Sequence, residues 1–459
     1  MRYRLPVLIA ALLLGAGCSS SHGAGLPPIA QANHAIQTAP STQGSTRKPL
    51  DIGAFPADID AFPVDMGAIP VNSSAFPVCT QQSGHALCHS QYRSDIPAIP
   101  VANLPQGQIP GYHPADLQNA YGLSTAIAAG ANQTIAVIVA YHAPYLASDL
   151  ATYRQAFGLP ACSFGPTATT GPVAAAPGMM GPTMPGGPTP IGPAAGGSCL
   201  RFVYSGGSQP PVSIAWDIEA TLDVEMVSAI CPRCRIMVVE APDDMISSLS
   251  AAVDVAVRNG ATEISNSYTA PETDTSLQQY ESHYNHPGVP ITAAAGDTGF
   301  GTGFPASVNG VIAVGGTSLI NAPGYGWASA VWQGTGSGCA MWGSKPAWQT
   351  DNLCATRTMN DLAVVADPAT GVAAYVSPAG GWAVFGGTSV SSPMVASMYA
   401  LAGNASSINA AQSLYANAGS FNPVTARSNG TCSIFLLCNG GIGFDAPSGL
   451  GSPYGLSAF

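Results

Sequence analysis

The chain has 459 residues, of which 46% are hydrophobic and 8% charged, and its formal net charge is −11 at pH 7. This length accommodates one large or two ordinary domains with a sizeable core. Only 13 residues are Lys or Arg and they form no basic cluster in the sequence, so nucleic acid is excluded as an expected partner. The abundance of apolar residues also differs from the composition of disordered chains. We expect a globular, acidic protein whose sparsely charged surface suits an acidic setting.

The amino terminus has the pattern of an export signal. Two arginines precede an apolar run over residues 5–14, which is shorter than the ~20 residues of a membrane-spanning helix. Small residues then lead to Cys18, as at a bacterial lipoprotein cleavage site, although Gly15 stands where Leu is usual. We predict an export signal over residues 1–17, followed by either a cell-envelope lipoprotein with its lipid on Cys18 or a secreted protein. Membrane contact is expected only through that anchor, and the protein is expected to be a monomer.

The cysteine count agrees with export. Eleven cysteines leave ten once Cys18 is set aside, an even number that suits disulfides in an oxidising compartment. The sequence does not fix their connectivity, and pairing between nearest neighbours is the simplest hypothesis. It predicts the pairs Cys79–Cys88, Cys162–Cys199, Cys231–Cys234, Cys339–Cys354 and Cys432–Cys438. The spacing of the third pair also occurs in redox and zinc sites, but no second pair of matching spacing exists, which favours a structural disulfide.

The first quarter of the chain is predicted to be a tether and a repeat. Residues 18–50 are rich in small and polar residues and have the composition of a flexible tether. Within 51–109, Ala-Phe-Pro or Ala-Ile-Pro recurs every seven residues from Ala54 to Pro77. A proline in each unit argues against a coiled coil because it removes a helix donor. We expect an extended segment and linker, which either is a spacer or lies across the folded domain; the spacer is the simpler interpretation.

From residue 110 onward, apolar strands alternate with helices. Strands are expected at 134–141, 236–240, 263–268 and 289–295, and helices at 148–157, 244–259 and 275–286. This alternation predicts an α/β fold with a mostly parallel sheet and helices on both faces. A stretch rich in Gly and Pro over residues 165–198, bracketed by two cysteines, is predicted to be a surface insertion loop.

The segment 216–230 is predicted to be an amphipathic helix with two carboxyl groups on its apolar side. Glu219 and Asp223 fall in the middle of the apolar stripe, whereas Asp217 and Glu225 are expected to face solvent. An acidic pair on a helix is usually exposed to solvent. Here the expected solvent face is already occupied by Asp217 and Glu225, so an exposed pair would require polar residues on the opposite, apolar face as well. Two inward carboxyls close together cannot both ionise at low cost, which separates their pKa values and suits proton transfer.

A second segment, 386–393, reads Gly-Gly-Thr-Ser-Val-Ser-Ser-Pro and leads into an apolar helix. A serine at a helix start lies among free backbone N–H groups that can stabilise an oxyanion, although it is also an ordinary helix cap. Gly-Thr-Ser-x-x-x-Pro is the nucleophile motif of subtilisin-like peptidases. Such a serine needs a base, and no histidine after residue 110 stands in the subtilisin His-Gly-Thr-His context. The inward carboxyl pair is the base that the sequence offers instead.

The chain resembles the sedolisins, serine-carboxyl peptidases with a subtilisin-like fold and a Ser-Glu-Asp triad. The resemblance covers about residues 110–459 and rests on three motifs in order: Glu-x-x-x-Asp on a helix, Gly-Asp after an apolar strand, and Gly-Thr-Ser-x-x-x-Pro. It implies a three-layer α/β sandwich in which Ser389 is the nucleophile, Glu219 the general base and Asp223 the residue that orients Glu219. Asp297 corresponds to the oxyanion residue, which donates a hydrogen bond only while protonated and therefore favours acidic pH.

The resemblance also implies a substrate-pairing strand and a calcium site. Ser267 lies in the strand that pairs with extended peptides in this family. One structural Ca²⁺ would be held by Asp445 and by oxygens of Gly441, Gly443 and Val424, but Pro423 stands where the first Asp of this site is usual, which weakens a site for a hard cation. The amino-terminal segment is also short and repeat-rich compared with the folded prodomain usual in the family.

Two hypotheses about function follow. The first is an exported serine-type endopeptidase that hydrolyses protein or peptide substrates through an acyl-enzyme. The second is a catalytically inactive surface protein that uses a sedolisin-like scaffold for binding. The complete set of triad residues favours the first, whereas the altered calcium motif and the short amino-terminal segment keep the second open.

Overall fold

The computed structural model describes residues 74–459 except 83, 166, 170–197, 323 and 325. The predicted export signal, Cys18, the tether, the first three repeat units and most of the insertion over 165–198 therefore lie outside the described residues. Among the helices that are described, none is long and apolar enough to cross a membrane.

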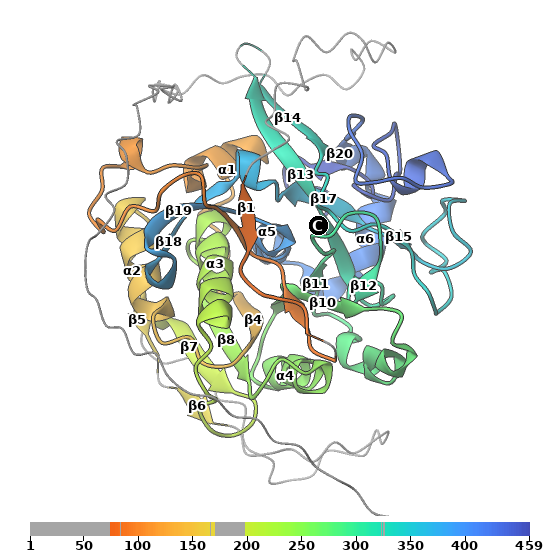
Figure 1. Cartoon of the computed structure of the whole chain (residues 1–459). Coiled ribbons are helices and arrows are strands. Elements are labelled where there is room, and N and C mark those ends of the chain that lie inside the picture. The colour runs from red at the N-terminus through yellow and green to blue at the C-terminus, as the bar shows by residue number, and fades with distance from the viewer. Residues whose placement is uncertain (1–73, 83, 166, 170–197, 323, 325) are drawn as a thin grey trace, which may run out of the picture. The chain divides into compact units, whose positions relative to one another are not determined.

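A ten-stranded sheet forms the centre of the described domain (Figure 1). Across the sheet its strands are β14 (Gly326–Val331), β13 (Ile312–Ala322), β11 (Ile291–Ala294), β9 (Glu263–Asn266), β4 (Thr134–Ala140), β8 (Arg235–Ala241), β7 (Ser198–Tyr204) and β5 (Ser163–Phe164), with β17 (Leu362–Val365) beside β13 and β6 (Ala168–Thr169) beside β7. Neighbouring strands are parallel except for β13 and β14. The mostly parallel sheet predicted from the alternation is therefore confirmed.

Helices cover both faces of this sheet, which explains why its central strands are apolar throughout. All residues of β4 are buried, and a strand covered on both faces needs no alternation of polar side chains. Helices α1 (Pro114–Ala120), α2 (Leu146–Ala156) and α5 (Thr388–Ala402) pack around α3 (Ile214–Ile230), whereas α4 (Ile246–Arg258) packs with the 3₁₀ helix η5 (Thr275–Tyr284).

From Trp216 onward helix α3 is buried on all sides, which corrects the expectation that its outer face is solvated. Asp217 and Glu225 have no exposed surface. The carboxyl group of Glu225 accepts a hydrogen bond at 3.0 Å from the backbone N–H of Tyr375 in β18 (Val372–Val376), and Asp217 accepts one at 3.4 Å from the N–H of Tyr145. The outer polar stripe thus binds the backbone of a further layer instead of water, and the periodicity of one helix cannot reveal such a layer.

Three short strands of the predicted linker take part in the fold. β1 (Ala75–Pro77) and β3 (Gln91–Arg93) extend an antiparallel sheet in the order β1-β3-β19-β18, where β19 spans Gly381–Gly386. β2 (Leu87–Cys88) joins β10 (Tyr268–Pro271), which also pairs with β12 (Gly303–Phe304). The last repeat unit and the described part of the linker therefore pair with strands of the domain (orange in Figure 1). The first three repeat units lie outside the described residues, so both interpretations of the repeat, a spacer or a segment across the domain, stay open.

All five predicted disulfides are formed: Cys79–Cys88, Cys162–Cys199, Cys231–Cys234, Cys339–Cys354 and Cys432–Cys438. Such bonds persist in oxidising compartments and thus suggest an exported protein. The remaining short elements are β15 (Gly338–Cys339), β16 (Thr358–Met359), β20 (Phe421–Asn422), β21 (Ser452–Pro453), α6 (Ala410–Ala416) and the 3₁₀ turns η4 (Gln106–Gln108), η6 (Pro368–Thr370), η7 (Ser377–Ala379), η8 (Ala405–Ser407), η9 (Ala418–Ser420) and η10 (Phe435–Leu437).

Candidate active site

Glu219 and Asp223 lie one turn apart on α3, and neither has exposed surface. The Ser267 hydroxyl donates to Oδ1 of Asp223 at 2.7 Å, and the backbone N–H of Ser90 donates to Oε2 of Glu219 at 2.8 Å. Burial raises the pKa of Glu219 to about 7. Burial, and then the charge of Glu219, raise the pKa of Asp223 well above its usual range. Asp223 therefore keeps its proton under conditions in which Glu219 can lose one, and the two carboxyls divide into an acid and a base.

Ser389 stands in the first turn of α5, which packs against α3. The turn before it requires glycine: Gly387 has a φ of +94°, and a Cβ there would lie 1.8 Å from the carbonyl oxygen of His89. The Ser389 side chain is fully buried, and its Oγ donates to the carbonyl oxygen of Ser267 at 3.4 Å. The same hydroxyl lies near enough to the Glu219 carboxyl group to moderate the rise in its pKa, and Oε1 of Glu219 has no hydrogen-bond partner among the described residues. The serine and the predicted base are thus neighbours.

Asp297 follows β11 and reaches the start of the same helix. Its Oδ1 accepts hydrogen bonds at 2.8 Å from both the N–H and the hydroxyl of Thr388, and its Oδ2 accepts one at 3.0 Å from Nε2 of Gln91. Burial raises the pKa of Asp297 to about 7, although the bonds from Thr388 oppose this rise. Below that pH the carboxyl group is neutral and can donate a hydrogen bond beside Ser389, as an oxyanion group must.

Ser267 contacts both the acidic pair and the catalytic serine. Its hydroxyl holds Asp223, whereas its backbone carbonyl accepts from Ser389 Oγ and, at 3.3 Å, from the N–H of His89. Because the side chain of Ser267 faces the carboxyl pair, only the backbone of this residue would pair with a substrate, as the sequence analysis expects.

Three residues that the sequence analysis did not single out, His89, Ser90 and Gln91, also reach the cluster. His89 is 3% exposed, its Nε2 lies 2.7 Å from Oγ1 of Thr269, and its Nδ1 lies 4.0 Å from Oδ1 of Asp297. Burial lowers the pKa of His89 to about 3, so the ring is neutral over most of the pH range. These residues stand in no motif of the sequence that marks them for catalysis. The nearby pair of cysteines was the available signal that this segment is ordered.

Among the residues predicted to hold calcium, Asp445 contributes the one carboxyl group, and that group is engaged with protein donors in the structure. The Asp445 carboxyl is fully buried and accepts hydrogen bonds from the N–H of Gly441 at 3.0 Å, from the N–H of Ser448 at 2.8 Å and from the Ser448 hydroxyl at 2.9 Å. Both of its oxygens thus face donors, whereas calcium needs converging oxygen ligands. Pro423 supplies no second carboxylate, and the described residues contain no group of three His, Cys, Asp or Glu arranged for a metal ion.

Comparison with known proteins gives likenesses in sequence and in structure, whereas no protein-family model matches the chain. In sequence the chain is similar to kumamolisin from Bacillus sp. (strain MN-32), with 29% identity over an alignment of 287 residues that covers 52% of this chain and 50% of that protein. The chain therefore spans about half the length of this curated relative. In structure it is similar to Pseudomonas sedolisin, a serine-carboxyl proteinase complexed with two molecules of pseudo-iodotyrostatin, with a TM-score of 0.59, 22% identity and coverage of 76% of this chain and 96% of that one.

A further solved structure, that of the prenylagaramide maturation protease PagA, covers 73% of this chain and 97% of its own at 18% identity, but its TM-score of 0.38 is too low to support an inference. The likeness to Pseudomonas sedolisin shows the sedolisin fold. Together with the similarity to kumamolisin, it agrees with the resemblance to sedolisins that the three motifs indicate.

Proposed function

We propose that the protein is an exported serine-type endopeptidase that hydrolyses peptide bonds in protein or peptide substrates. The observation that supports this most strongly is the convergence of Ser389, Glu219, Asp223 and Asp297 in one buried cluster, although they come from three separate segments of the chain. A carboxyl pair with separated pKa values next to a serine hydroxyl is suited to nucleophilic catalysis, and a structural role does not require that arrangement.

In the proposed reaction, ionised Glu219 takes the proton of Ser389 as Oγ attacks the carbonyl carbon of the scissile bond. Protonated Asp297 and a backbone N–H in the first turn of α5 donate to the oxyanion that forms. Glu219 then gives the proton to the leaving amine, which breaks the peptide bond and leaves an acyl ester on Ser389. A water molecule, deprotonated by Glu219, hydrolyses this ester. Asp223 stays protonated and holds Glu219 in position throughout.

The same groups support an acidic working range. Asp297 must be neutral to donate, and it loses its proton as the pH rises through about 7. Glu219 must be ionised to accept a proton, and opening the site to water brings its pKa down toward the ordinary value because hydration favours the charged form. Asp297 is neutral and Glu219 is ionised at the same time only on the acidic side of neutral pH.

The proposed function is tested by cleavage of a denatured protein between pH 3 and 7. We expect Ser389→Ala and Glu219→Gln to lower kcat/KM by on the order of 10³-fold or more, since each removes a member of one catalytic unit. Binding of unfolded peptide without Ser389-dependent cleavage at any pH would instead support the inactive scaffold. The mass of the mature amino terminus tests the accompanying proposal that residues 1–17 are removed and shows whether Cys18 carries a lipid.

A further inference from the structure

Large apolar side chains that the catalytic cluster does not use are exposed on segments next to the candidate active site. Phe300 is 40% exposed, Ile434 44%, Phe435 67% and Ile442 74%. We call these four side chains the ridge. Three of them belong to residues 428–444, a stretch of the sequence without a charged residue. Exposed apolar side chains that gather in one region mark a binding surface, because contact between apolar area and water costs free energy.

A disulfide makes the central part of the ridge rigid. Cys432–Cys438 closes a ring with a sequence separation of 6, and Ile434 and Phe435 belong to this ring. The carbonyl of Phe435 accepts hydrogen bonds from the backbone N–H of Asn439 at 3.0 Å and from its side-chain amide at 2.9 Å. A ring held in this way loses little conformational entropy on binding, so its apolar side chains are preorganised for contact with a partner.

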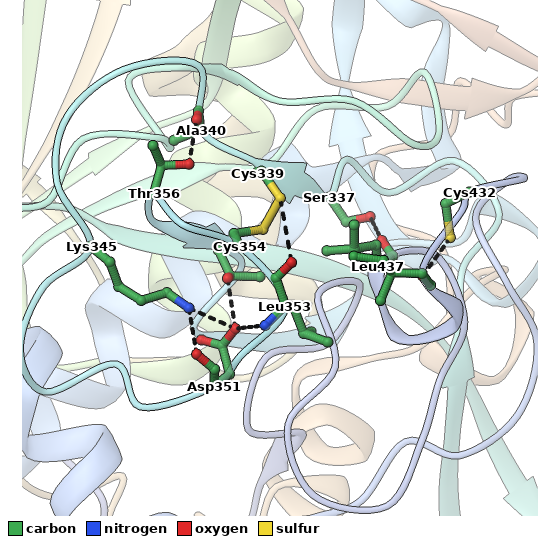
Figure 2. Close-up of a disulfide and its surroundings, with 12 residues drawn as sticks. Ser337, Cys339, Ala340, Lys345, Asp351, Leu353, Cys354, Thr356, Cys432 and Leu437 are labelled. Atoms are coloured by element: carbon green, nitrogen blue, oxygen red, sulfur yellow. Dashed lines mark hydrogen bonds and ion pairs between the residues drawn. A yellow bond between two sulfur atoms is a disulfide. The ribbon is translucent and has the colours of Figure 1, made fainter.

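Hydrogen bonds attach the ring to the loop that follows Asp297. The Ser337 hydroxyl donates to the carbonyl of Leu437 in the ring at 2.7 Å, as Figure 2 shows. The backbone of Ser337 also pairs with that of Gly301 in both directions, at 2.8 and 2.9 Å. The ring and the loop after Asp297 are thus held next to each other by one shared residue.

Phe300 connects the ridge with the catalytic cluster. It lies three residues after Asp297, so the two Cα atoms are at most about 11 Å apart. Its N–H donates to the carbonyl of Asn429 at 2.9 Å, and the N–H of Asn429 donates to the carbonyl of Cys438 at 2.9 Å. An extended peptide advances by about 3.3 Å per residue. A peptide cleaved at Ser389 would therefore reach the ridge with a residue about three or more positions from the scissile bond.

We propose that the ridge is a secondary binding surface for unfolded polypeptide substrates and favours those with a large apolar side chain three or more residues from the scissile bond. The inference rests on the proposed function, because a peptidase must hold a polypeptide at Ser389 and the same polypeptide then passes the ridge.

Charge disfavours the other partners of an apolar surface. Residues 428–444 contain no Lys or Arg, whereas segments that bind lipid bilayers usually combine apolar with basic residues. The net charge of −11 opposes the association of two copies of the chain. An unfolded polypeptide with apolar side chains meets neither obstacle.

Pairs of peptides test the inference. Both members share a core taken from a bond that the parent chain cleaves in a denatured protein, and they differ at one position, three to six residues from that bond on either side, which is Phe or Ser. In the parent, Phe at one or more positions should raise kcat/KM roughly 5- to 30-fold through a lower KM, because part of the ring is buried on binding. Phe435→Ser should abolish this preference and leave cleavage of the Ser peptides within about twofold. An unchanged preference overturns the proposal.

A second exposed phenylalanine provides the matched control. Phe164 in β5 is 53% exposed, and four strands of the central sheet separate β5 from β11, which precedes Asp297. Phe164→Ser makes the same chemical change away from the ridge and should leave the preference for Phe peptides within about twofold. An equal loss in Phe164→Ser and Phe435→Ser would assign the effect to the surface as a whole and would overturn the proposal.

Two further variants keep the inference testable if Phe435→Ser does not fold. Ile442 lies beside the ring, because the side chain of Leu436 lies against Gly441, and Ile442→Ser should weaken the preference in the same direction. Phe435→Leu keeps an apolar side chain and should retain the preference within about threefold. A preference that survives in Ile442→Ser, or disappears in Phe435→Leu, contradicts an apolar contact at the ridge.

Binding to the full chain with Ser389→Ala separates failure of the inference from failure of the proposed function. The probe is a fluorescein-labelled protein that has been reduced and carboxymethylated, and anisotropy reports its binding. If the parent cleaves peptides without a preference that depends on Phe435, the inference is wrong and the proposed function stands. If no form cleaves but Phe435→Ser weakens binding of the probe, the ridge binds polypeptide and the proposed function is wrong. If neither is observed, both are wrong.

The other partners give outcomes of their own. Binding of the protein to phosphatidylcholine vesicles, or dimerisation in sedimentation, that Phe435→Ser abolishes while the preference for Phe peptides is unchanged would assign the ridge to a bilayer or to a second copy. Either result overturns the proposal.

Discussion

The proton on Asp297 controls the alkaline limit of the proposed reaction. Because burial raises the pKa of this carboxyl to about 7, kcat/KM should fall about tenfold per pH unit above that value as the donor ionises. In Asp297→Asn the amide donates at every pH, so this fall should disappear while activity at pH 5 drops by no more than about tenfold. Rates measured between pH 4 and 9 in the same active form of the chain test this prediction. The same alkaline fall in both proteins would assign it to another group.

At the scale of single residues, the catalytic groups could be predicted from the sequence, but the residues that bond to them from the segment 89–91 could not. Glu219, Asp297 and Ser389 stand in short motifs whose chemistry can be recognised locally. Ser90 contributes a backbone N–H, and every residue except proline has one, so the sequence carries no mark of that contact. The strands β2 and β3 on either side of Ser90 are two and three residues long, too short for periodicity, and long-range pairing alone fixes them.

At the scale of the element, α3 illustrates how a second layer changes the meaning of a polar stripe. Burial raises the pKa of Glu225 well above its usual range, so the side chain is a neutral acid that accepts from the N–H of Tyr375. Glu225→Gln keeps this acceptor and should change the free energy of unfolding by less than about 1 kcal/mol at pH 5. Glu225→Ala leaves the N–H of Tyr375 unpaired and a cavity behind, and should cost about 2–4 kcal/mol. Urea denaturation of both variants checks this, and equal losses would contradict it.

The loop around Asp445 should be stable without calcium. Burial raises the pKa of this carboxyl to about 7, and Ser448 and Gly441 supply the donors that satisfy it. We expect that a calcium chelator shifts Tm by less than about 2 °C, whereas Ser448→Ala costs about 1–3 kcal/mol through the lost hydroxyl. Thermal melts with chelator and with added calcium decide the matter. A Tm that falls by many degrees in chelator would show that calcium binds here after all.

At the scale of the whole molecule, the alternation of strands and helices predicted the sheet, but it could not show how many carboxyl groups the layers enclose. Burial also raises the pKa of acids that are not part of the catalytic cluster, among them Asp149, Asp217, Glu225, Glu240, Glu263, Glu272 and Asp367. The low content of charged residues noted at the outset is thus accompanied by acids whose protonated form the native state favours.

These acids predict a fold that is most stable in acid. A carboxyl whose pKa is higher in the folded than in the unfolded chain binds a proton on folding, so its contribution is complete below the unfolded pKa and is lost as the pH rises through the folded one. For Asp217 that window runs from about 4 to about 6, and for Glu263 from about 4.5 to about 8. One pKa unit corresponds to about 1.4 kcal/mol, so each group alone changes stability by a few kcal/mol. Urea unfolding at pH 4, 6 and 8 and constant ionic strength should show a steady decrease, which Glu263→Gln should reduce between pH 6 and 8 because an amide does not titrate. Stability that is constant or rises over this range would show that the buried acids are ionised in the native state.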